Sequence, residues 1–358
     1  MISVLVVDDS GFMRLALRKM LERDPVIRVV AEAATAADAI HMALLHNPDV
    51  ITMDIEMPGG SGLDATVEIM ERSPRPIIVI SSLTKDGSET AVQALQKGAV
   101  DYISKASSYV DLDIVAIERD LLRKIRYWGE HSQRIARMQA RDSELVRARK
   151  PGTIPSSVQT SGRPELIVIG ASTGGPKALP ELFKGVKRLT CPVLIALHMP
   201  PIYTESFARH LAEATGHSAR EGHDGYRLRD QDVVVAPGGL DTHVQVGLGG
   251  GFVMRVRKDP EYTLHPSVDA LFLSAARTGR NVAGVVMTGM GEDGRKGATA
   301  LHQAGHPVIA QSEDSCLVYG MPRAVAEAGV ASAVLPLPEI ARTMTSWAGA
   351  EPRHRSQA

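Results

Sequence analysis

Short apolar runs alternate with amphipathic stretches along this chain, and the alternation restricts the possible folds more than any other feature. Between residues 2 and about 125, the runs VLVV, DVITM, PIIVI and VDYIS are rich in β-branched residues and predict strands. The stretches between them have helical spacing of apolar residues. Strands that are apolar throughout and separated by helices predict a parallel sheet with helices on both faces.

The alternation returns from about residue 164, in the runs ELIVIG, PVLIALHM, DVVVAPG, VAGVVMTG and HPVIAQ. A chain of 358 residues exceeds what one hydrophobic core usually organises. We therefore predict two doubly wound α/β domains, at 1–125 and 164–350, and a tail at 351–358. The linker between them, 126–163, is rich first in charge and then in Pro, Ser, Thr and Gly. Its early part is able to extend the preceding helix.

Charge and cysteine content narrow the class of protein. The chain has 40 Lys plus Arg against 41 Asp plus Glu, so no overall field attracts nucleic acid. Its two cysteines, Cys191 and Cys316, have no metal-ligand spacing and indicate a reducing compartment. No apolar run approaches the about 20 residues of a membrane span, and no signal peptide is recognisable. We expect a cytoplasmic protein without nucleic-acid binding or membrane insertion.

Polar side chains follow the predicted strands of the first half. Asp8 and Asp9 end the first strand, Asp54 the third, Ser81 the fourth and Lys105 the fifth. The carboxyl ends of parallel strands meet at one edge of the sheet, where ligands bind. A lone Asp there is explained as a turn or N-cap residue. Three carboxylates repel one another unless a hard cation such as Mg²⁺ is present, so the set predicts a pocket for metal and phosphoryl groups.

This ordered set, together with DIEMPGGSGLDA after the third strand, resembles the receiver domain of bacterial response regulators over residues 1 to about 125. The resemblance implies a flavodoxin-like fold and a histidine kinase as phosphodonor. It also implies Mg²⁺ bound for phosphorylation. The residue roles it implies are phosphorylation at Asp54, metal binding by Asp8, Asp9 and Asp54, and switching by Ser81 and Tyr102 with Lys105.

The sequence departs from the receiver pattern at one position. Receivers usually have proline after this lysine, whereas Ala106 follows Lys105 here. Without proline, a cis peptide bond costs an extra ~2.5 to 4 kcal/mol. We therefore expect this loop to be trans or strained.

The second half contains the glycine-rich turn GASTGGPK between an apolar strand and a helix. It lacks the P-loop pattern because Pro176 follows Gly175, and it lacks the dinucleotide fingerprint because Ser172 replaces the second glycine. It does match G-x-S-x-G from Gly170 to Gly174, a turn that presents a nucleophilic serine beside free N–H groups of a helix. Serine is also a common N-cap, so the motif alone leaves both roles open.

A nucleophilic serine needs a base, and the base needs an orienting acid. The next strand ends in His198, and the later strand VAGVVMTG leads into a loop with Asp293. The order Ser, His, Asp differs from that of α/β-hydrolases. Position after an apolar strand favours this pair over the other candidates, which are His243, His265, Asp232, Asp241 and Asp269.

Six motifs in the second half resemble, in order, the catalytic domain of chemotaxis protein-glutamate methylesterases, the CheB family, over residues 164 to 348. They are IGASTGGPKAL, HMPPIYTESFARHL, VVVAPGG, HPSVDALF, TGMGEDG and VYGMPRA. The resemblance implies a Rossmann-like domain with Ser172 as nucleophile, His198 as general base and acid, and Asp293 as its orienter. Thr173 and the backbone N–H of Met290 are implied to line the substrate and oxyanion site.

The two resemblances together imply a phosphorylation-activated enzyme of chemotaxis adaptation. Its implied substrate is a glutamate γ-methyl ester on the cytoplasmic domain of a chemoreceptor, with a glutamine amide there as an implied second substrate. Ester hydrolysis by such a triad requires no cofactor. A rival output domain that binds DNA predicts a concentrated basic helix, which the second half lacks. A rival esterase with a target outside chemotaxis stays open.

Overall fold

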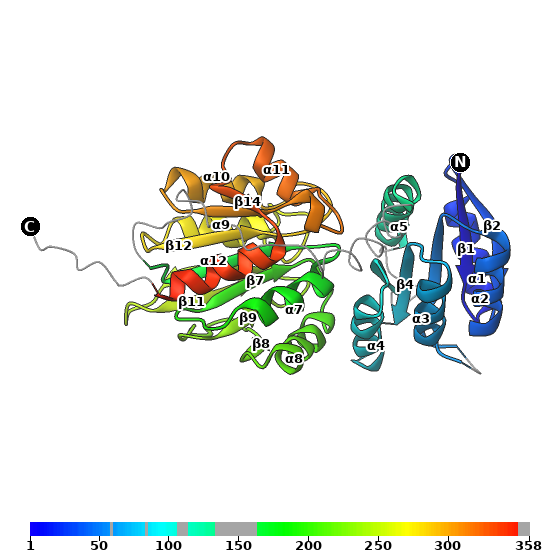
Figure 1. Cartoon of the computed structure of the whole chain (residues 1–358), viewed down its shortest axis with the longest axis horizontal. Helices are drawn as coiled ribbons and strands as arrows, with labels where there is room; N and C mark the ends of the chain where they lie inside the picture. The colour runs from blue at the N-terminus through cyan, green and yellow to red at the C-terminus, as the bar shows by residue number, and fades with distance from the viewer. Residues whose placement is uncertain (58–59, 83–84, 106–113, 133–162, 350–358) are drawn as a thin grey trace, which may run out of the picture. The chain divides into compact units, whose positions relative to one another are not determined.

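The computed structural model describes residues 1–57, 60–82, 85–105, 114–132 and 163–349. The chain divides into two compact units, Met1–Pro151 and Gly152–Ala358 (Figure 1). Ala106, residues 133–162 of the predicted linker and the tail at 351–358 lie outside the described residues. Among the helices that are described, none is both long and apolar enough to cross a membrane.

The N-terminal unit is a five-stranded parallel sheet with helices on both faces, as predicted. Its strand order is β2-β1-β3-β4-β5, the doubly wound order of flavodoxin-like folds. Helix α5 ends at Glu130, so it continues beyond the domain end predicted at 125. The elements are β1 Ile2–Val7, α1 Gly11–Leu21, β2 Ile27–Ala33, α2 Ala36–His46, β3 Val50–Asp54, α3 Gly62–Arg72, β4 Ile77–Ser82, α4 Lys85–Gln96, β5 Asp101–Lys105 and α5 Ile114–Glu130.

Side-chain caps start the first three helices of this unit. Ser10, Thr35 and Ser61 accept hydrogen bonds from backbone N–H groups two or three residues ahead, which satisfies donors that have no partner within the helix. The residues at which these three helices begin are therefore fixed by their caps. Strand β1 is buried on both faces, which explains its continuous apolar sequence.

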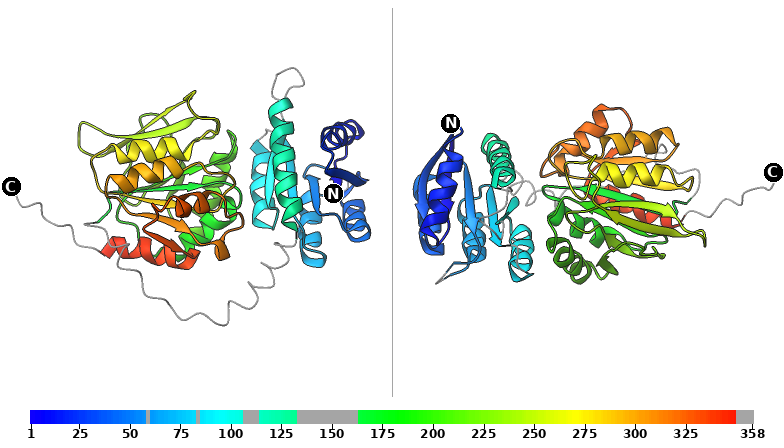
Figure 2. Two further views of the ribbon diagram at one scale, coloured as in Figure 1. Left: turned by 90° about the horizontal axis from the view of Figure 1, so that it is seen from above. Right: turned by 180° about the vertical axis from the view of Figure 1, so that it is seen from behind.

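The C-terminal unit is built on a seven-stranded parallel sheet of order β14-β13-β12-β6-β7-β9-β8. Helices α7, α8 and α12 cover one face and α9, α10 and α11 the other (Figures 1 and 2). The elements are β6 Leu166–Ala171, α7 Gly175–Gly185, β7 Val193–Leu197, α8 Tyr203–Thr215, β8 Ala219–Glu221, β9 Val233–Val235, β10 Asp241–Val246, β11 Phe252–Arg257, α9 Val268–Ala276, β12 Val282–Val286, α10 Arg295–Gln303, β13 Val308–Gln311, α11 Met321–Glu327, β14 Ala333–Leu335 and α12 Leu337–Gly349.

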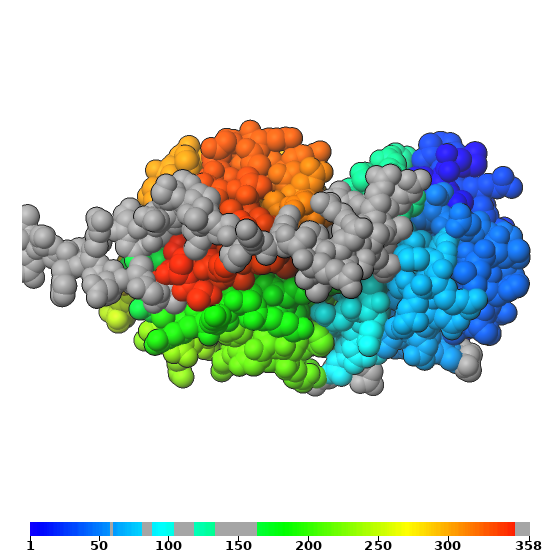
Figure 3. All heavy atoms as spheres, viewed as in Figure 1, coloured from blue at the N-terminus to red at the C-terminus, as the bar shows by residue number. Residues whose placement is uncertain are grey.

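Two features of this unit lie outside the predicted alternation. Strands β10 and β11 form a separate antiparallel hairpin, and their sequences, DTHVQV and FVMRVR, mix polar and apolar residues and are exposed toward the turn. Helix α12, red in Figure 3, packs on α7, where a Cβ added to Gly185 would lie 2.8 Å from Ala341 Cβ. The apolar core on the other face joins the central strands to α9, α10 and α11, so the loops at the sheet edge start from a rigid base.

Candidate active site and acidic pocket

Strand β6 lies between β7 and β12, and this order decides which side chains meet at the sheet edge. Ala171 pairs with Leu197, and the His198 N–H donates to the Ala171 carbonyl at 3.1 Å. On the other side, the Ser172 N–H donates to the Thr288 carbonyl at 3.0 Å. Ser172 and His198 therefore leave the sheet from neighbouring strand ends, as the sequence predicted.

The N-cap alternative for Ser172 is wrong. Helix α7 starts after Gly174, which has no side chain to cap it and a φ of 83°. A Cβ there would lie 2.9 Å from Thr288 Oγ1, so both the backbone conformation and the space favour glycine. Thr173, buried, follows Ser172, and its carbonyl accepts from Thr288 Oγ1 at 2.9 Å.

The loop after β12 approaches Ser172 closely. A Cβ on Gly289 would lie 2.8 Å from Ser172 Cβ and 2.3 Å from Met321 Sδ, so a side chain at this position would press on the predicted nucleophile. Met290 follows and is 9% exposed. The loop that carries Met290 thus borders Ser172, where the sequence predicted an oxyanion donor.

His198 and Asp293 form a hydrogen bond, with 2.8 Å between His198 Nε2 and Asp293 Oδ2. Both side chains are nearly buried, at 11% and 12% exposure. Because Nε2 faces the carboxylate, Nδ1 is the ring nitrogen on the opposite side, and it is the one that would exchange a proton with a substrate or nucleophile. The two residues lie 95 positions apart in the chain.

The N-terminus of α9 holds the Asp293 carboxylate. Oδ2 accepts from the Val268 N–H at 2.7 Å, and Oδ1 accepts from the Asp269 N–H at 2.9 Å. The Ser267 hydroxyl donates to Oδ1 at 3.1 Å while also capping α9. These donors are fixed by the helix, so the carboxylate has one orientation toward the imidazole.

The surroundings of Asp293 keep it ionised. Burial acts to raise the pKa of its carboxyl, but the hydrogen bond and charge of His198 and the backbone N–H groups of α9 outweigh burial and lower the pKa below its usual value. An ionised carboxylate stabilises the imidazolium that forms when a histidine takes a proton.

Asp269, an alternative acid in the sequence, has a different role. Its Oδ1 accepts from the N–H groups of Gly294 and Gly297, at 3.0 and 2.8 Å, and so caps α10. The Gly294 N–H also donates to Asp293 Oδ1 at 3.0 Å. Burial, followed by the nearby Asp293 charge, raises the pKa of Asp269 to about 6. Asp293 thus caps α9 while Asp269, on α9, caps α10.

The remaining alternatives are engaged elsewhere. Asp241 Oδ2 lies 2.6 Å from His265 Nδ1, and its Oδ1 accepts from the Ser267 N–H at 2.9 Å. His243 Nε2 lies 3.6 Å from Asp259. Asp232 accepts from the Tyr226 hydroxyl and from the Arg229 N–H, at 3.1 and 2.9 Å. Asp241 and His265 act on the site indirectly, because they fix the segment that starts α9.

The acidic pocket of the N-terminal unit lies between β1 and β3, where the strand order reverses. Asp8, Asp9 and Asp54 each offer a carboxylate oxygen, and these three oxygens lie within 4.8 Å of one another. Asp8 and Asp54 are buried and Asp9 is exposed. Three clustered hard oxygen donors, one of them open to solvent, fit a divalent cation that keeps several waters.

The start of α3 packs closely against the backbone of Asp54, the predicted phosphoacceptor. A Cβ on Gly62 would lie 1.9 Å from the Asp54 carbonyl oxygen, so glycine is required where α3 begins. Tyr102 is 7% exposed on β5, and the Lys124 ammonium lies 5.2 Å from its ring centre. Lys105 ends β5 as predicted, whereas β4 continues one residue beyond Ser81 to Ser82. The side chains of Ser81 and Lys105 lie outside the described part of the chain.

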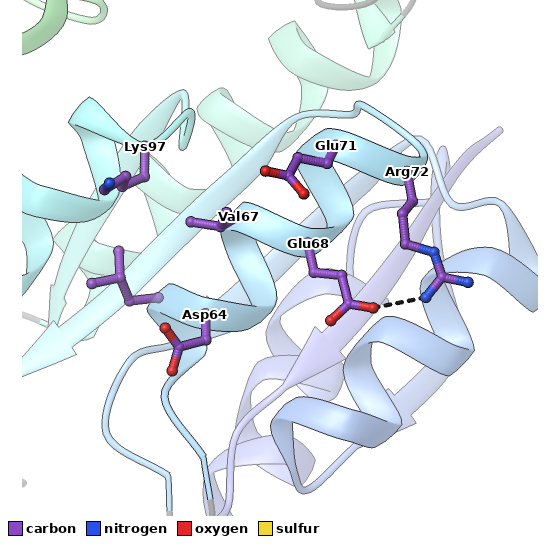
Figure 4. Close-up of a pocket in the computed structure, with 7 residues that line it drawn as sticks. Asp64, Val67, Glu68, Glu71, Arg72 and Lys97 are labelled. Atoms are coloured by element: carbon purple, nitrogen blue, oxygen red, sulfur yellow. Dashed lines mark hydrogen bonds and ion pairs between the residues drawn. The ribbon is translucent and has the colours of Figure 1, made fainter.

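The N-terminal unit also has a shallow surface groove of about 630 Å³ along α3 (Figure 4). Its described lining contains none of the predicted site residues and is mostly charged, with an ion pair of 2.7 Å between Arg72 and Glu68. The lining consists of Leu63, Asp64, Val67, Glu68, Glu71, Arg72 and Lys97.

Comparison with known families matches both units. Residues 4–115 match the response regulator receiver domain, and residues 167–344 match the CheB methylesterase. A protein of Oleidesulfovibrio alaskensis named protein-glutamate methylesterase/protein-glutamine glutaminase 1 is 39% identical over 96% of this chain and 98% of its own. Proteins of Carboxydothermus hydrogenoformans and Pseudomonas aeruginosa, each named protein-glutamate methylesterase/protein-glutamine glutaminase 2, are 42% and 39% identical. The first match covers 95% of this chain and the second 97%, and each covers 97% of the relative.

Proposed function

The chain belongs to the CheB methylesterase family, and on this basis we propose that it hydrolyses glutamate γ-methyl esters of chemoreceptors in chemotaxis adaptation, under control of its receiver domain. The observation that carries the proposal is the 2.8 Å bond between His198 and Asp293 at the sheet edge where Ser172 directly follows the neighbouring strand. It supports the roles of nucleophile for Ser172, base for His198 and orienting acid for Asp293.

In the reaction we propose, Ser172 attacks the ester carbonyl while His198 takes its proton. His198 then gives that proton to the departing methoxide, so that methanol leaves and an acyl-enzyme remains. Water, activated by His198, hydrolyses the acyl-enzyme to glutamate. Asp293 holds the imidazole in one orientation and stabilises its charged form. No step needs a cofactor.

The oxyanion formed by this attack requires N–H donors beside Ser172. At the start of α7, the Gly175 and Lys177 N–H groups donate to the Ser172 and Gly174 carbonyls and Pro176 has no N–H. The Met290 N–H, on the loop that borders Ser172, is therefore our candidate, and Thr173 lines the same turn. The same attack on a glutamine side chain releases ammonia, more slowly because an amide is a poorer acyl donor.

The receiver supplies the control. A histidine kinase is the phosphodonor, Asp54 is the phosphoacceptor, and Asp8, Asp9 and Asp54 would hold Mg²⁺, which neutralises charge on the transferring phosphoryl group. Ser81, Lys105 and Tyr102 would respond to the phosphorylated state. These partners and the cytoplasmic domain of the receptor require the protein to act in the cytoplasm.

The test measures methanol release from a methylated chemoreceptor with Mg²⁺, in the presence and absence of a small-molecule phosphodonor. Ser172→Ala protein serves as the blank. We expect release that rises with the phosphodonor and is absent from the blank. Hydrolysis of other protein methyl esters, with none of the receptor, would instead favour an esterase with a target outside chemotaxis.

A further inference from the structure

Ile202 has an unusual backbone conformation four residues after His198. Its φ is 75° and its ψ is −40°, at the N-cap of α8. A β-branched residue with positive φ is strained, because Cβ approaches the backbone carbonyl, whereas glycine adopts the same angles at little cost. Such strain persists where the surrounding structure imposes it, and it is commonest at functional sites.

Burial does not explain an isoleucine here. Its side chain is 39% exposed, while the next residue, Tyr203, is fully buried and supplies the packing at the start of α8. The chain therefore carries backbone strain at a position where the side chain gains only part of the hydrophobic stabilisation available to a core residue.

The segment that carries Ile202 is joined to two other loops. The Gly238 N–H donates to Thr204 Oγ1 at 2.9 Å, and the Gly239 N–H donates to the His265 carbonyl at 3.2 Å. A Cβ on Gly239 would lie 2.8 Å from Pro201 Cγ, so glycine permits the close contact. The three loops thus form one packed rim.

Each of these loops presents one exposed aliphatic side chain. Ile202, Leu240 and Leu264 are 39%, 38% and 44% exposed, and we call them the apolar rim. The first loop begins at His198, and the third leads through His265 into Ser267, which donates to Asp293. The apolar rim is therefore built on the segments that carry the base and hold the acid of the proposed triad.

We propose that the apolar rim seats a helix of the substrate protein on either side of the esterified glutamate, with Ile202 contacting an apolar side chain one turn away. The inference rests on the proposed function. A helix places residues three and four positions apart on one face, about 5 to 6 Å from each other, so aliphatic contacts can flank the ester. Any occupant other than the substrate would compete with the ester for the same edge.

The test separates recognition of the helix from the chemistry. The full-length chain, activated with phosphodonor, is assayed on a methylated receptor bundle and on a short peptide with one glutamate methyl ester. Ile202→Gly relieves the strain, so its melting temperature should rise. It also removes the apolar contact, so kcat/KM for the bundle, divided by kcat/KM for the peptide, should fall about tenfold, mainly through KM.

Leu240→Ser and Leu264→Ser should lower the same ratio. Leu248→Ser is the matched control, because Leu248 is also an exposed leucine but lies in the turn between β10 and β11, about 17 Å along the strand from Asp241. Its ratio should equal that of the wild type.

The outcomes are distinct. An Ile202→Gly protein that is more stable and keeps the wild-type ratio would overturn the proposed contact. Equal losses from the rim variants and from Leu248→Ser would also overturn it, since the effect would then be general. Failure of the wild type to hydrolyse either substrate would reject the proposed function, and the apolar rim with it.

Discussion

Both units of this protein gather carboxylates at the carboxyl edge of a parallel sheet, but they stabilise the negative charge in different ways. The N-terminal pocket brings three carboxylate oxygens within 4.8 Å. The C-terminal edge instead gives Asp293 an imidazole and a set of N–H and O–H donors from α9 and its cap. The first arrangement suits an added cation, whereas the second is complete within the protein.

The contrast shows how one kind of sheet edge serves two chemistries. A clustered, partly exposed set of acids has the ligand chemistry for a hard cation, and such a cation would in turn attract a phosphoryl group. A single buried acid with fixed donors has one orientation, which a catalytic histidine needs. Changing the charge at each edge should therefore have different consequences.

Asp293→Asn should have the largest effect. The amide can present an N–H to His198 in place of an acceptor, and it cannot stabilise an imidazolium, so kcat should fall by about 10³ to 10⁴. Methanol release under saturating substrate measures this. Melting temperature and circular dichroism control for folding, because Asp293 also caps α9. A folded variant with near-wild-type kcat would remove Asp293 from the proposed triad.

Removal of divalent metal should affect the function of the N-terminal acidic pocket and leave the chemistry of the C-terminal sheet edge unchanged. With EDTA, phosphodonor should no longer phosphorylate Asp54, and its whole stimulation of methanol release should disappear. Release without phosphodonor should continue, because the proposed triad contains no metal.

Asp54→Asn provides the matched comparison for this experiment. It should be as unresponsive to phosphodonor with Mg²⁺ as the wild type is with EDTA. If EDTA also abolished the methanol release seen without phosphodonor, the C-terminal unit would need a metal. That result would contradict the assignment of the metal to the N-terminal unit alone.

Asp269→Asn should have the smallest effect, and one that depends on pH. The raised pKa means that the folded state binds a proton at Asp269 more tightly than the unfolded chain does. Wild-type stability from this group is therefore present at low pH and is lost as pH rises from about 4 through about 6. Asparagine removes the loss, so the melting temperature of the variant relative to wild type should increase by about 2 to 4 °C across this range.

Thermal unfolding at several pH values between 4.5 and 7.5 provides the measurement. The carbonyl oxygen of asparagine can still accept from Gly294 and Gly297, so the capping of α10 is kept. A difference in melting temperature that stays constant with pH would show that Asp269 does not titrate as its burial requires.

The fold and the strand-end residues were predictable because parallel strands are apolar throughout and their polar residues collect at one end. The apolar runs before Asp54, Ser172 and His198 carry this information locally. The predicted two-domain α/β fold is confirmed.

Other features depend on contacts between distant segments and have no local signal. The hairpin of β10 and β11 was missed because its strands, DTHVQV and FVMRVR, lack the continuous apolar pattern of the parallel strands. Position after an apolar strand favoured Asp293 over Asp269 as the acid, but the capping of α10 by Asp269 had no local signal, because it joins residues 25 and 28 positions apart. The positive φ of Ile202 is unexpected for a β-branched residue.

The reciprocal capping of α9 and α10 also protects particular backbone amides from exchange with solvent. The amide hydrogens of Val268, Asp269 and Gly294 lie on carboxylates that belong to the other helix or its preceding loop. They can exchange with solvent deuterium only when the two helix starts separate, and that event also releases Asp293 from its position beside His198. The exchange rate of these three amides therefore measures how often Asp293 leaves its position beside His198 while the rest of the molecule stays folded.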